Sequence, residues 1–157
     1  MEIYLYLENN MIHYHLSKDK KKVLSYVKEE PRLKFLLLQM YKHHLPTYQH
    51  TLRVALLAKD FAERLGFSPE EAYKAGKGAL LHDLGKIKVP SEILNAETKP
   101  QGEDWELLKK HVCFTREYLF ALEVEDKTVL YIALAHHEFQ IEPYYRQKIG
   151  AWLNIER

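Results

Sequence analysis

Cysteine, glycine and proline are scarce in this chain, and neither sign of charge prevails. The single cysteine, Cys113, excludes an intramolecular disulfide, which fits a reducing compartment. The six glycines and six prolines form no flexible linker, so we expect one domain with a single core. A formal net charge of +1 is not that of a protein that coats a polyanion, so no DNA or RNA polymer is expected as a partner.

Long hydrophobic runs are also missing. The N-terminal stretch MEIYLYLENN has neither the basic region nor the long apolar region of a signal peptide. No apolar run reaches the roughly 20 residues that a membrane span needs. We therefore expect a cytoplasmic protein with no membrane partner. The oligomeric state is left open, a homodimer included.

The first residues read as strands and the others as helices. Alternating apolar residues on either side of Asn9 and Asn10 predict a β-hairpin over residues 1–16. Residues 17–157 are predicted to form a helical domain, because apolar residues recur there at helical spacing between capping signals. The expected fold class is therefore mainly α, a helical bundle with a small N-terminal hairpin.

Several helix boundaries can be read from capping residues. Pro31 suits the first turn of a helix through about His44, and His43 and His44 are expected to cap its end. Thr47 is expected to cap the next helix, which ends at Gly66. The apolar stripe of that helix, which we expect to be buried, consists of Val54, Leu57, Ala58, Phe61 and Leu65.

The clearest helix signal begins at Ser68, which forms a capping box with Glu71 and is followed by a proline at the first helical position. Gly85 is the expected stop, so His82 and Asp83 are predicted to lie on the last turn.

Two further helices are expected nearer the C-terminus. One covers residues 103–123 and carries His111. The other is capped by Asp126 and ends near His136 and His137.

Histidine is abundant, with nine in the chain. Five of them fall on four predicted helices and mostly beside apolar positions: His50, His82, His111, His136 and His137. Such long spacing differs from a local zinc motif and predicts a site in the centre of a bundle. Adjacent residues on a helix point about 100° apart, so the neighbouring pairs could face two ions. The two oxygens of Asp83 could bridge them, and this donor set suits iron, manganese, zinc or cobalt.

Four segments form an ordered pattern: HTLRV at His50, HDLGKIKVP at His82, HV at His111 and HHE at His136. Together they resemble the HD superfamily of metal-dependent phosphohydrolases, and specifically its HD-GYP branch, over residues 45–145. The resemblance implies an all-α HD-type fold and hydrolysis of phosphate esters. For the HD-GYP branch it implies cleavage of the bacterial messenger cyclic di-GMP.

The same resemblance implies roles for individual residues. Its first metal site matches His50, His82 and Asp83, with Asp83 also bridging to the second ion. Its second metal site matches His111, His136 and His137.

Lys86 matches the lysine that contacts substrate phosphate, so Asp83 and Lys86 are the expected catalytic residues. From the sequence alone, Lys86 could instead complement a helix dipole. Arg53 could contact substrate phosphate or brace Asp83.

This chain departs from the family pattern at three points. The segment HHEFQIEPYYR contains Pro143 but no Gly-Tyr-Pro, so specificity for cyclic di-GMP could differ. Pro46 stands where some HD-GYP proteins have a glutamate for a third metal, so two metals are expected. No aspartate follows Asp126. The chain could be a fragment, Glu142 or Glu156 could substitute, or the first metal could keep three protein ligands, which we favour.

These observations predict a metal-dependent phosphodiesterase or phosphatase that acts on a cyclic dinucleotide or another nucleotide through two divalent ions. The competing hypothesis is a signalling module that retains metal and binds its ligand with weak or no turnover.

Overall fold

The computed structural model describes residues 25–28 and 30–137 of the chain. This part consists of helices and connecting loops, and it contains no strand. The expectation of a mainly α fold is therefore confirmed for the described residues. The expected β-hairpin over residues 1–16 and the segment from Pro143 to Tyr145 lie outside them.

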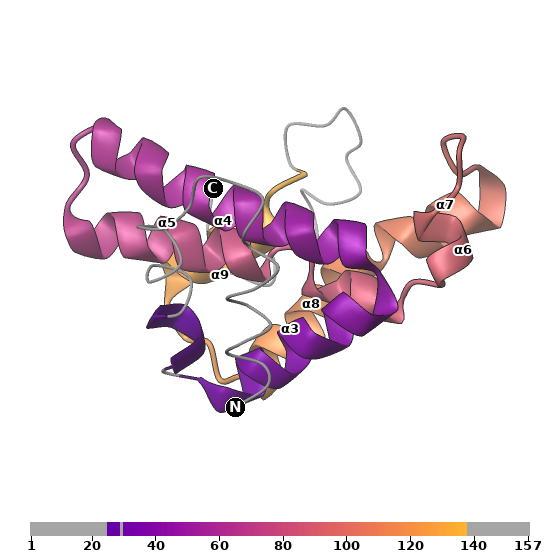
Figure 1. Cartoon of the computed structure of the whole chain (residues 1–157), viewed down its shortest axis with the longest axis horizontal. Coiled ribbons are helices and arrows are strands. Elements are labelled where there is room, and N and C mark those ends of the chain that lie inside the picture. The colour runs from indigo at the N-terminus through magenta and orange to yellow at the C-terminus, as the bar shows by residue number, and fades with distance from the viewer. Residues whose placement is uncertain (1–24, 29, 138–157) are drawn as a thin grey trace, which may run out of the picture.

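The helices follow one another with short connections (Figure 1). The longest, α4, pairs with α5 to form an extended helical hairpin. In chain order the elements are α3 (Pro31–His43), α4 (Leu45–Arg64), α5 (Pro69–Leu81), the 3-10 helix η1 (Leu84–Lys88), α6 (Ser91–Leu94), α7 (Gly102–Lys109), α8 (His111–Ala121) and α9 (Lys127–Leu134).

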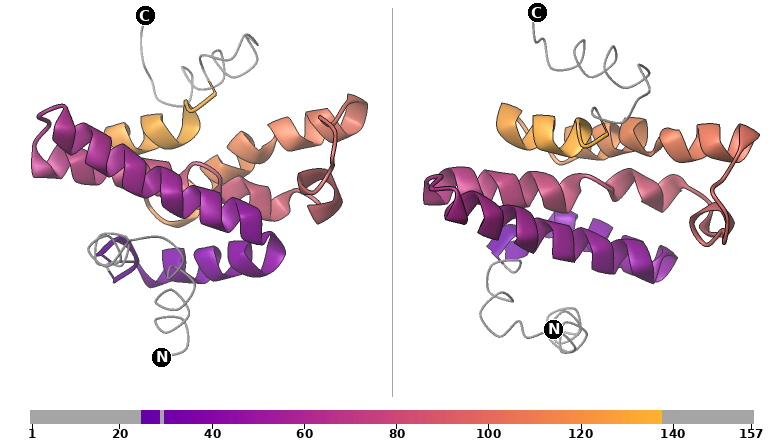
Figure 2. Two further views of the ribbon diagram at one scale, coloured as in Figure 1. Left: turned by 45° about the horizontal axis from the view of Figure 1, so that its top comes forward. Right: turned by 90° about the horizontal axis from the view of Figure 1, so that it is seen from above.

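Helix α5 and η1 form the middle of the fold. Figure 2 shows α8 and α9 on one side of them and α3 and α4 on the other. Helix α9 packs on α5, while α3 and α8 both pack on η1. The junction between α5 and η1, where His82 and Asp83 lie, is therefore covered from both sides.

Apolar side chains from all of these layers meet in one core. Burying a leucine side chain contributes about 2 kcal/mol relative to leaving it exposed. The largest fully buried side chains are Tyr26, Leu33, Met40, Leu80, Leu81, Leu84, Leu119, Leu134, Val89 and Val112. Three of these flank the α5–η1 junction, so the polar residues there lie within the core.

The start of α5 agrees with its sequence signal. Ser68 Oγ accepts a hydrogen bond from the Glu71 backbone N–H at 3.2 Å, and the Glu71 carboxylate accepts one from the Ser68 N–H at 2.8 Å. The predicted end of the helix was wrong. Helix α5 stops at Leu81 with His82 as its C-cap, so His82 and Asp83 lie just beyond the last turn.

Gly85 does not act as a helix stop. It lies within η1, where a Cβ would stand 1.8 Å from the carbonyl oxygen of His111. The missing side chain therefore lets η1 approach the first turn of α8. This close approach brings His111 next to Asp83.

Helix α4 begins earlier than the sequence indicated. His44 is its N-cap, and the imidazole Nδ1 accepts a hydrogen bond from the Thr47 N–H at 3.2 Å. Thr47 is therefore the third helical residue and not the cap. Pro46 fits the first turn because the N–H that it lacks would have no partner inside the helix.

The predicted buried stripe of α4 faces outward at three of its positions. Leu57, Phe61 and Leu65 are 68%, 64% and 60% exposed. The opposite face, which includes Ala55 and Ala62, is buried instead, because small side chains let α5 pack closely. Apolar periodicity marked both faces of this helix and could not show which one is covered.

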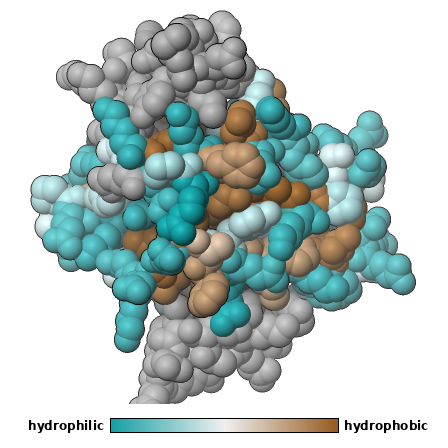
Figure 3. Space-filling model, turned by 90° about the horizontal axis from the view of Figure 1, so that it is seen from below, coloured by the Kyte–Doolittle hydropathy of each residue, from teal (hydrophilic) through white to brown (hydrophobic). Residues whose placement is uncertain are grey.

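Other apolar side chains are also exposed, including Phe35 on α3 and Phe120 on α8. Figure 3 views the molecule from below, the side on which these two helices lie, and shows apolar surface bordered by hydrophilic side chains. None of the helices among the described residues combines the length and apolar character that crossing a membrane requires.

The helix predicted over residues 103–123 is two helices. Helix α7 ends at Lys109 and α8 begins at His111, with Lys110 between them. The His111 ring Nδ1 lies 2.6 Å from the carbonyl oxygen of Leu108. A side chain that bonds to the helix backbone interrupts the regular ladder, and here the interruption turns His111 toward the core.

Replacing Gly85 with alanine should destabilise the protein by about 3 kcal/mol, because an added methyl group would overlap the backbone of α8. Thermal or urea unfolding measures this change. Gly102→Asn is the matched control, because Gly102 has open space around it and asparagine tolerates its positive φ. Equal stability of the Gly85→Ala variant and the wild type would show that the packing explanation is wrong.

Candidate metal centre

The structure brings the five predicted histidines and Asp83 together from four parts of the chain. His50 lies within α4, and His82 and Asp83 follow the end of α5. His111 is the first residue of α8, and His136 and His137 follow the end of α9. Most of these side chains project from helix ends, where a single turn can aim them at the centre of the fold.

The six side chains form two groups. The candidate ligand atoms of His50, His82 and Asp83 all lie within 4.8 Å of one another. In this first group, Asp83 Oδ2 is 3.1 Å from His82 Nε2 and 3.9 Å from His50 Nε2. His50 remains half exposed, so this group opens toward solvent.

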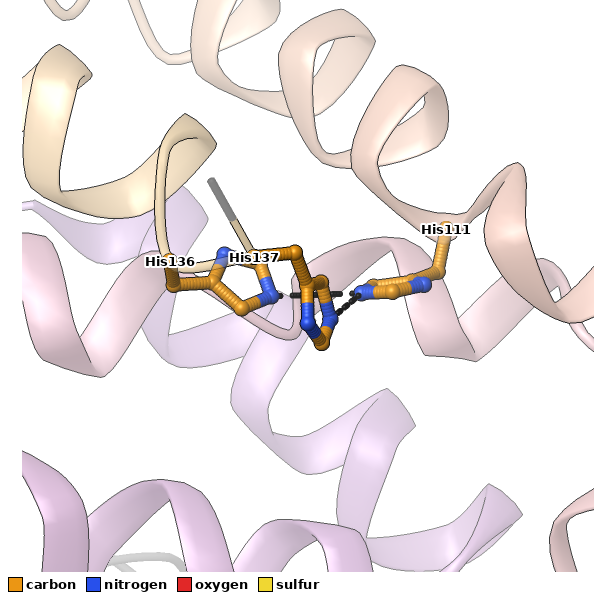
Figure 4. Close-up of side chains that lie close together, drawn as sticks. All are labelled: His111, His136 and His137. Atoms are coloured by element: carbon orange, nitrogen blue, oxygen red, sulfur yellow. Dashed lines mark hydrogen bonds between the residues drawn. The ribbon is translucent and has the colours of Figure 1, made fainter. Parts of the chain in front are cut away.

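The second group consists of His111, His136 and His137, whose ligand atoms also lie within 4.8 Å of one another. Figure 4 shows the three rings turned toward one another. The Nε2 atom of His111 is 3.3 Å from that of His136 and 3.2 Å from that of His137.

Asp83 faces both groups with different oxygens. Its Oδ2 points to the first group, while Oδ1 lies 3.6 Å from His111 Nε2 and 3.9 Å from His136 Nε2. The side chain is only 2% exposed, and Oδ1 is buried without a hydrogen-bond partner among the described residues. A cation in the second group would satisfy this oxygen, so the carboxylate is suited to bridge two ions.

Backbone carbonyl groups orient three of the rings. The Nδ1 atoms of His82, His111 and His136 lie 2.6, 2.6 and 2.9 Å from the carbonyl oxygen three residues earlier. A carbonyl only accepts, so each Nδ1 carries the proton and Nε2 is the atom left to bind a cation. A second bond of this kind is typical of metal-binding histidines.

Burial keeps two of these rings neutral. It lowers the pKa of His111 to about 4 and that of His136 to about 2. With Nδ1 protonated on both rings, their facing Nε2 atoms present two lone pairs to each other. A cation bound by both nitrogens would remove the repulsion between these lone pairs, so the donor set fits a metal ion.

Asp83 stays ionised despite its burial. Burial alone would raise its pKa, but the neighbouring His82 ring and the Lys86 ammonium group hold that pKa well below its ordinary value. Burial likewise lowers the pKa of His50. The site therefore combines an anionic carboxylate with three imidazoles, those of His50, His111 and His136, in which burial favours the neutral form.

Lys86 and Arg53, the two predicted phosphate contacts, lie in different surroundings. Lys86 Nζ is 2.8 Å from Asp83 Oδ2 and forms a partly buried ion pair with it. Arg53 is exposed on α4, and its charge reaches His50. Within the described part of the chain no contact of Arg53 with Asp83 is found, so the bracing role has no support.

Thr115 is a positioning residue that the sequence did not reveal. Its hydroxyl donates a hydrogen bond to the His82 carbonyl oxygen at 3.0 Å and accepts one from the Gly85 N–H at 2.9 Å. Thr115 is fully buried and lies one turn after His111. It therefore joins the helix that carries the second group to the turn that carries the first.

The sequence matches the HD domain family over residues 47–152. The chain belongs to the HD domain family. The resemblance that the sequence pattern suggested is thereby confirmed. HD phosphohydrolases depend on metal, and the two groups of this HD domain supply histidine and aspartate donors that could bind it.

Three relatives illustrate the similarity. The 3'3'-cGAMP-specific phosphodiesterase 3 of Vibrio cholerae is 34% identical over 92 residues, which cover 59% of this chain and 20% of the relative. A cyclic di-GMP phosphodiesterase of Pseudomonas aeruginosa is 32% identical over 59% of this chain and 22% of the relative. The cyclic di-GMP phosphodiesterase of Thermotoga maritima is 34% identical over 60% of this chain and 26% of the relative.

The matched part spans about a fifth to a quarter of the length of these relatives. No solved structure is significantly similar to this chain.

Protein loaded with a divalent transition metal should lose most of it when Asp83 is replaced with alanine, because the two oxygens of Asp83 face both groups. Elemental analysis of wild-type and variant protein measures the metal per chain. Asp60→Ala, on the same domain but outside both groups, is the control and should keep its metal. Equal metal in the Asp83→Ala and wild-type proteins would contradict a bridging role.

Thr115→Val should weaken metal binding about tenfold or more, because the loss of a supporting hydrogen bond frees the two groups to shift. Thr115→Ser keeps the hydroxyl and should retain near wild-type affinity. Metal titration of both variants, with circular dichroism to check the fold, gives the comparison. If the valine variant binds metal as tightly as the wild type and the serine variant does not, the methyl packing and not the hydroxyl is responsible.

Proposed function

We propose that this HD domain is a metal-dependent phosphodiesterase that acts on a cyclic dinucleotide or another nucleotide. The observation that carries the proposal is the orientation of Asp83, whose two oxygens face two separate groups of histidines. Such an arrangement suits two adjacent divalent cations, and two cations clamp a phosphate during hydrolysis.

In this proposal the first ion is held by His50, His82 and Asp83, and Asp83 also reaches the second. His111, His136 and His137 complete the second site. Imidazole and carboxylate donors suit iron, manganese, zinc or cobalt better than calcium. The first site keeps an open side because His50 is half exposed, which gives a phosphate access.

The chemistry can be divided between the ions and the protein. When bound, the ions lower the pKa of water enough to provide a nucleophile near neutral pH and offset phosphate charge. The protein orients the donors: the carbonyl oxygens of Ala79, Leu108 and Ala133 fix the rings so that Nε2 faces inward.

Lys86 is the proposed phosphate contact and catalytic partner of Asp83. Its ammonium group lies beside Asp83 Oδ2, within reach of the half-open first group. An ammonium donates hydrogen bonds to phosphate oxygens but cannot bind a cation while protonated. Arg53 lies on α4 less than one turn from His50 and is the proposed second contact, at the solvent side.

The names of the relatives support the substrate class. They are cyclic di-GMP and 3'3'-cGAMP phosphodiesterases, so a cyclic dinucleotide is the substrate that we favour. The division into an HD domain over residues 17–157 and an appendage over residues 1–16 is also part of the proposal.

The alternative is a signalling module that retains metal but has weak or no turnover. The sequence favours it at two points, since HHEFQIEPYYR lacks Gly-Tyr-Pro and no aspartate follows Asp126. Metal-loaded wild-type protein that binds cyclic di-GMP without hydrolysing it, and hydrolyses no generic phosphodiester, would support this alternative against our proposal.

Lys86→Ala and His82→Ala should separate the two roles. Lys86→Ala should lower the phosphodiesterase rate at least tenfold and leave metal content unchanged, since the ammonium group pairs with Asp83 but cannot bind a cation while protonated. His82→Ala should lose metal, activity and thermal stability together, because metal binding is linked to folding.

Metal content, melting temperature and turnover of cyclic di-GMP and a generic phosphodiester are measured for both variants. Loss of metal in Lys86→Ala would make the lysine part of the metal site. An unchanged rate would remove its proposed contact with substrate.

A further inference from the structure

Two consecutive histidines outside the metal centre bind the segment that carries Lys86. His43 and His44 form the corner between α3 and α4. The segment that they contact runs from η1 through α6, and Figure 1 shows it beside this corner. Neither histidine belongs to the two groups around Asp83.

His43 holds the end of η1. Its Nε2 lies 2.7 Å from the carbonyl oxygen of Val89, so Nε2 carries a proton and donates it. The Val89 N–H in turn donates to the Lys86 carbonyl oxygen at 3.1 Å and closes the last turn of η1. The imidazole is therefore joined to Lys86 through one backbone residue.

His44 holds the end of α6 and the start of α4 at once. Its Nδ1 accepts from the Thr47 N–H at 3.2 Å, and its Nε2 lies 3.2 Å from Asn95 Oδ1. Asn95 Nδ2 donates to the Ser91 carbonyl oxygen at 2.8 Å, which leaves the amide oxygen facing His44. Every polar atom of a neutral His44 ring thus has a partner, and burial favours this form by lowering the pKa of His44.

Apolar packing of α6 is limited, because Ile93 and Leu94 are only partly buried. Helix α6 has only four residues and none of them is buried. Its position therefore depends on polar contacts and on the anchored Val89, which is fully buried.

We propose that His43 and His44 are positioning residues that hold the segment from Leu84 to Asn95 so that Lys86 reaches the phosphate-binding side of the site. Because His44 also caps α4, the same corner sets the start of the helix that carries His50. Lys86 and His50 both approach Asp83 Oδ2. We call the His43–His44 corner, with its bonds to Val89 and Asn95, the clamp. The part that concerns substrate rests on the proposed function.

Variants can separate the two roles of His44, which are the cap on α4 and the bond to Asn95 that we call the tether. His44→Asn keeps an oxygen that accepts from Thr47 N–H, because asparagine is among the best N-caps, but it is too short to reach Asn95. Asn95→Ala removes the acceptor for His44 and the amide donor to the Ser91 carbonyl oxygen, and it leaves the cap unchanged. Asn95→Asp keeps an acceptor oxygen for His44. Glu92→Ala, on the exposed side of α6, is the control.

Amide hydrogen exchange of the whole 157-residue chain tests the tether without any turnover. Exchange at Ile93, Leu94 and position 95 should become about fivefold faster in His44→Asn, as expected for one lost hydrogen bond, and faster still in Asn95→Ala, which loses two. The double variant should show no further increase. Asn95→Asp, which loses only the bond to Ser91, should exchange more slowly than Asn95→Ala, and Glu92→Ala should exchange like the wild type. Unchanged exchange in either single variant, or additive effects in the double variant, would overturn the tether.

For His43, the pair His43→Leu and His43→Gln tests the bond to Val89, because glutamine keeps a donor and leucine does not. Exchange at the Val89 amide should rise about fivefold in the leucine variant and recover in the glutamine variant. Equal exchange in the two variants would remove His43 from the clamp.

Kinetics test the link to Lys86. With a generic phosphodiester, His44→Asn and Asn95→Ala should raise KM about fivefold with kcat and metal content unchanged, since a displaced Lys86 weakens phosphate binding. Faster exchange with an unchanged KM would overturn the positioning of Lys86. If the metal-loaded wild-type protein has no turnover but exchange responds as expected, the proposed function fails and the clamp remains.

Discussion

A buried, ionised carboxylate is the constraint on which this fold depends. Removing a charge from water costs several kcal/mol unless partners surround it. Asp83 is nearly inaccessible, and its Oδ2 has His82 and Lys86 within hydrogen-bond distance. Its other oxygen faces His111 and His136 without a hydrogen bond. Helix ends from several layers of the bundle therefore meet at one side chain, and the turn after α5 lies at the middle of the molecule.

The features that could be predicted from the sequence are those with local causes. The start of α5 follows from a serine, a proline and a glutamate within four residues, and Pro31 marks the start of α3 in the same way. The convergence of the histidines followed from their order and their apolar neighbours. The two capping signals are each complete within a short stretch of chain, whereas the histidines were grouped by their order over a long one.

The features that could not be predicted depend on what packs against them. Both faces of α4 carry apolar residues, and only the position of α5 shows that Ala55 is inside and Leu57 outside. Thr115 looks like an ordinary helix residue until His82 and Gly85 lie beside it. The cap at His44 was missed because histidine is not a usual N-cap, and its partner Asn95 lies far along the chain.

The sharing of Asp83 between two groups has a thermodynamic consequence. A cation in one group would fix the carboxylate through one oxygen, and this would change the orientation and charge that the other oxygen offers across the site. Occupancy of the two positions would therefore be linked, and the linkage would be reciprocal: whatever one cation does to the affinity for its neighbour, the neighbour does in return. Mutual repulsion of the cations opposes the benefit of a preoriented ligand. A titration of this protein should accordingly be described by a coupling free energy and not by two independent constants.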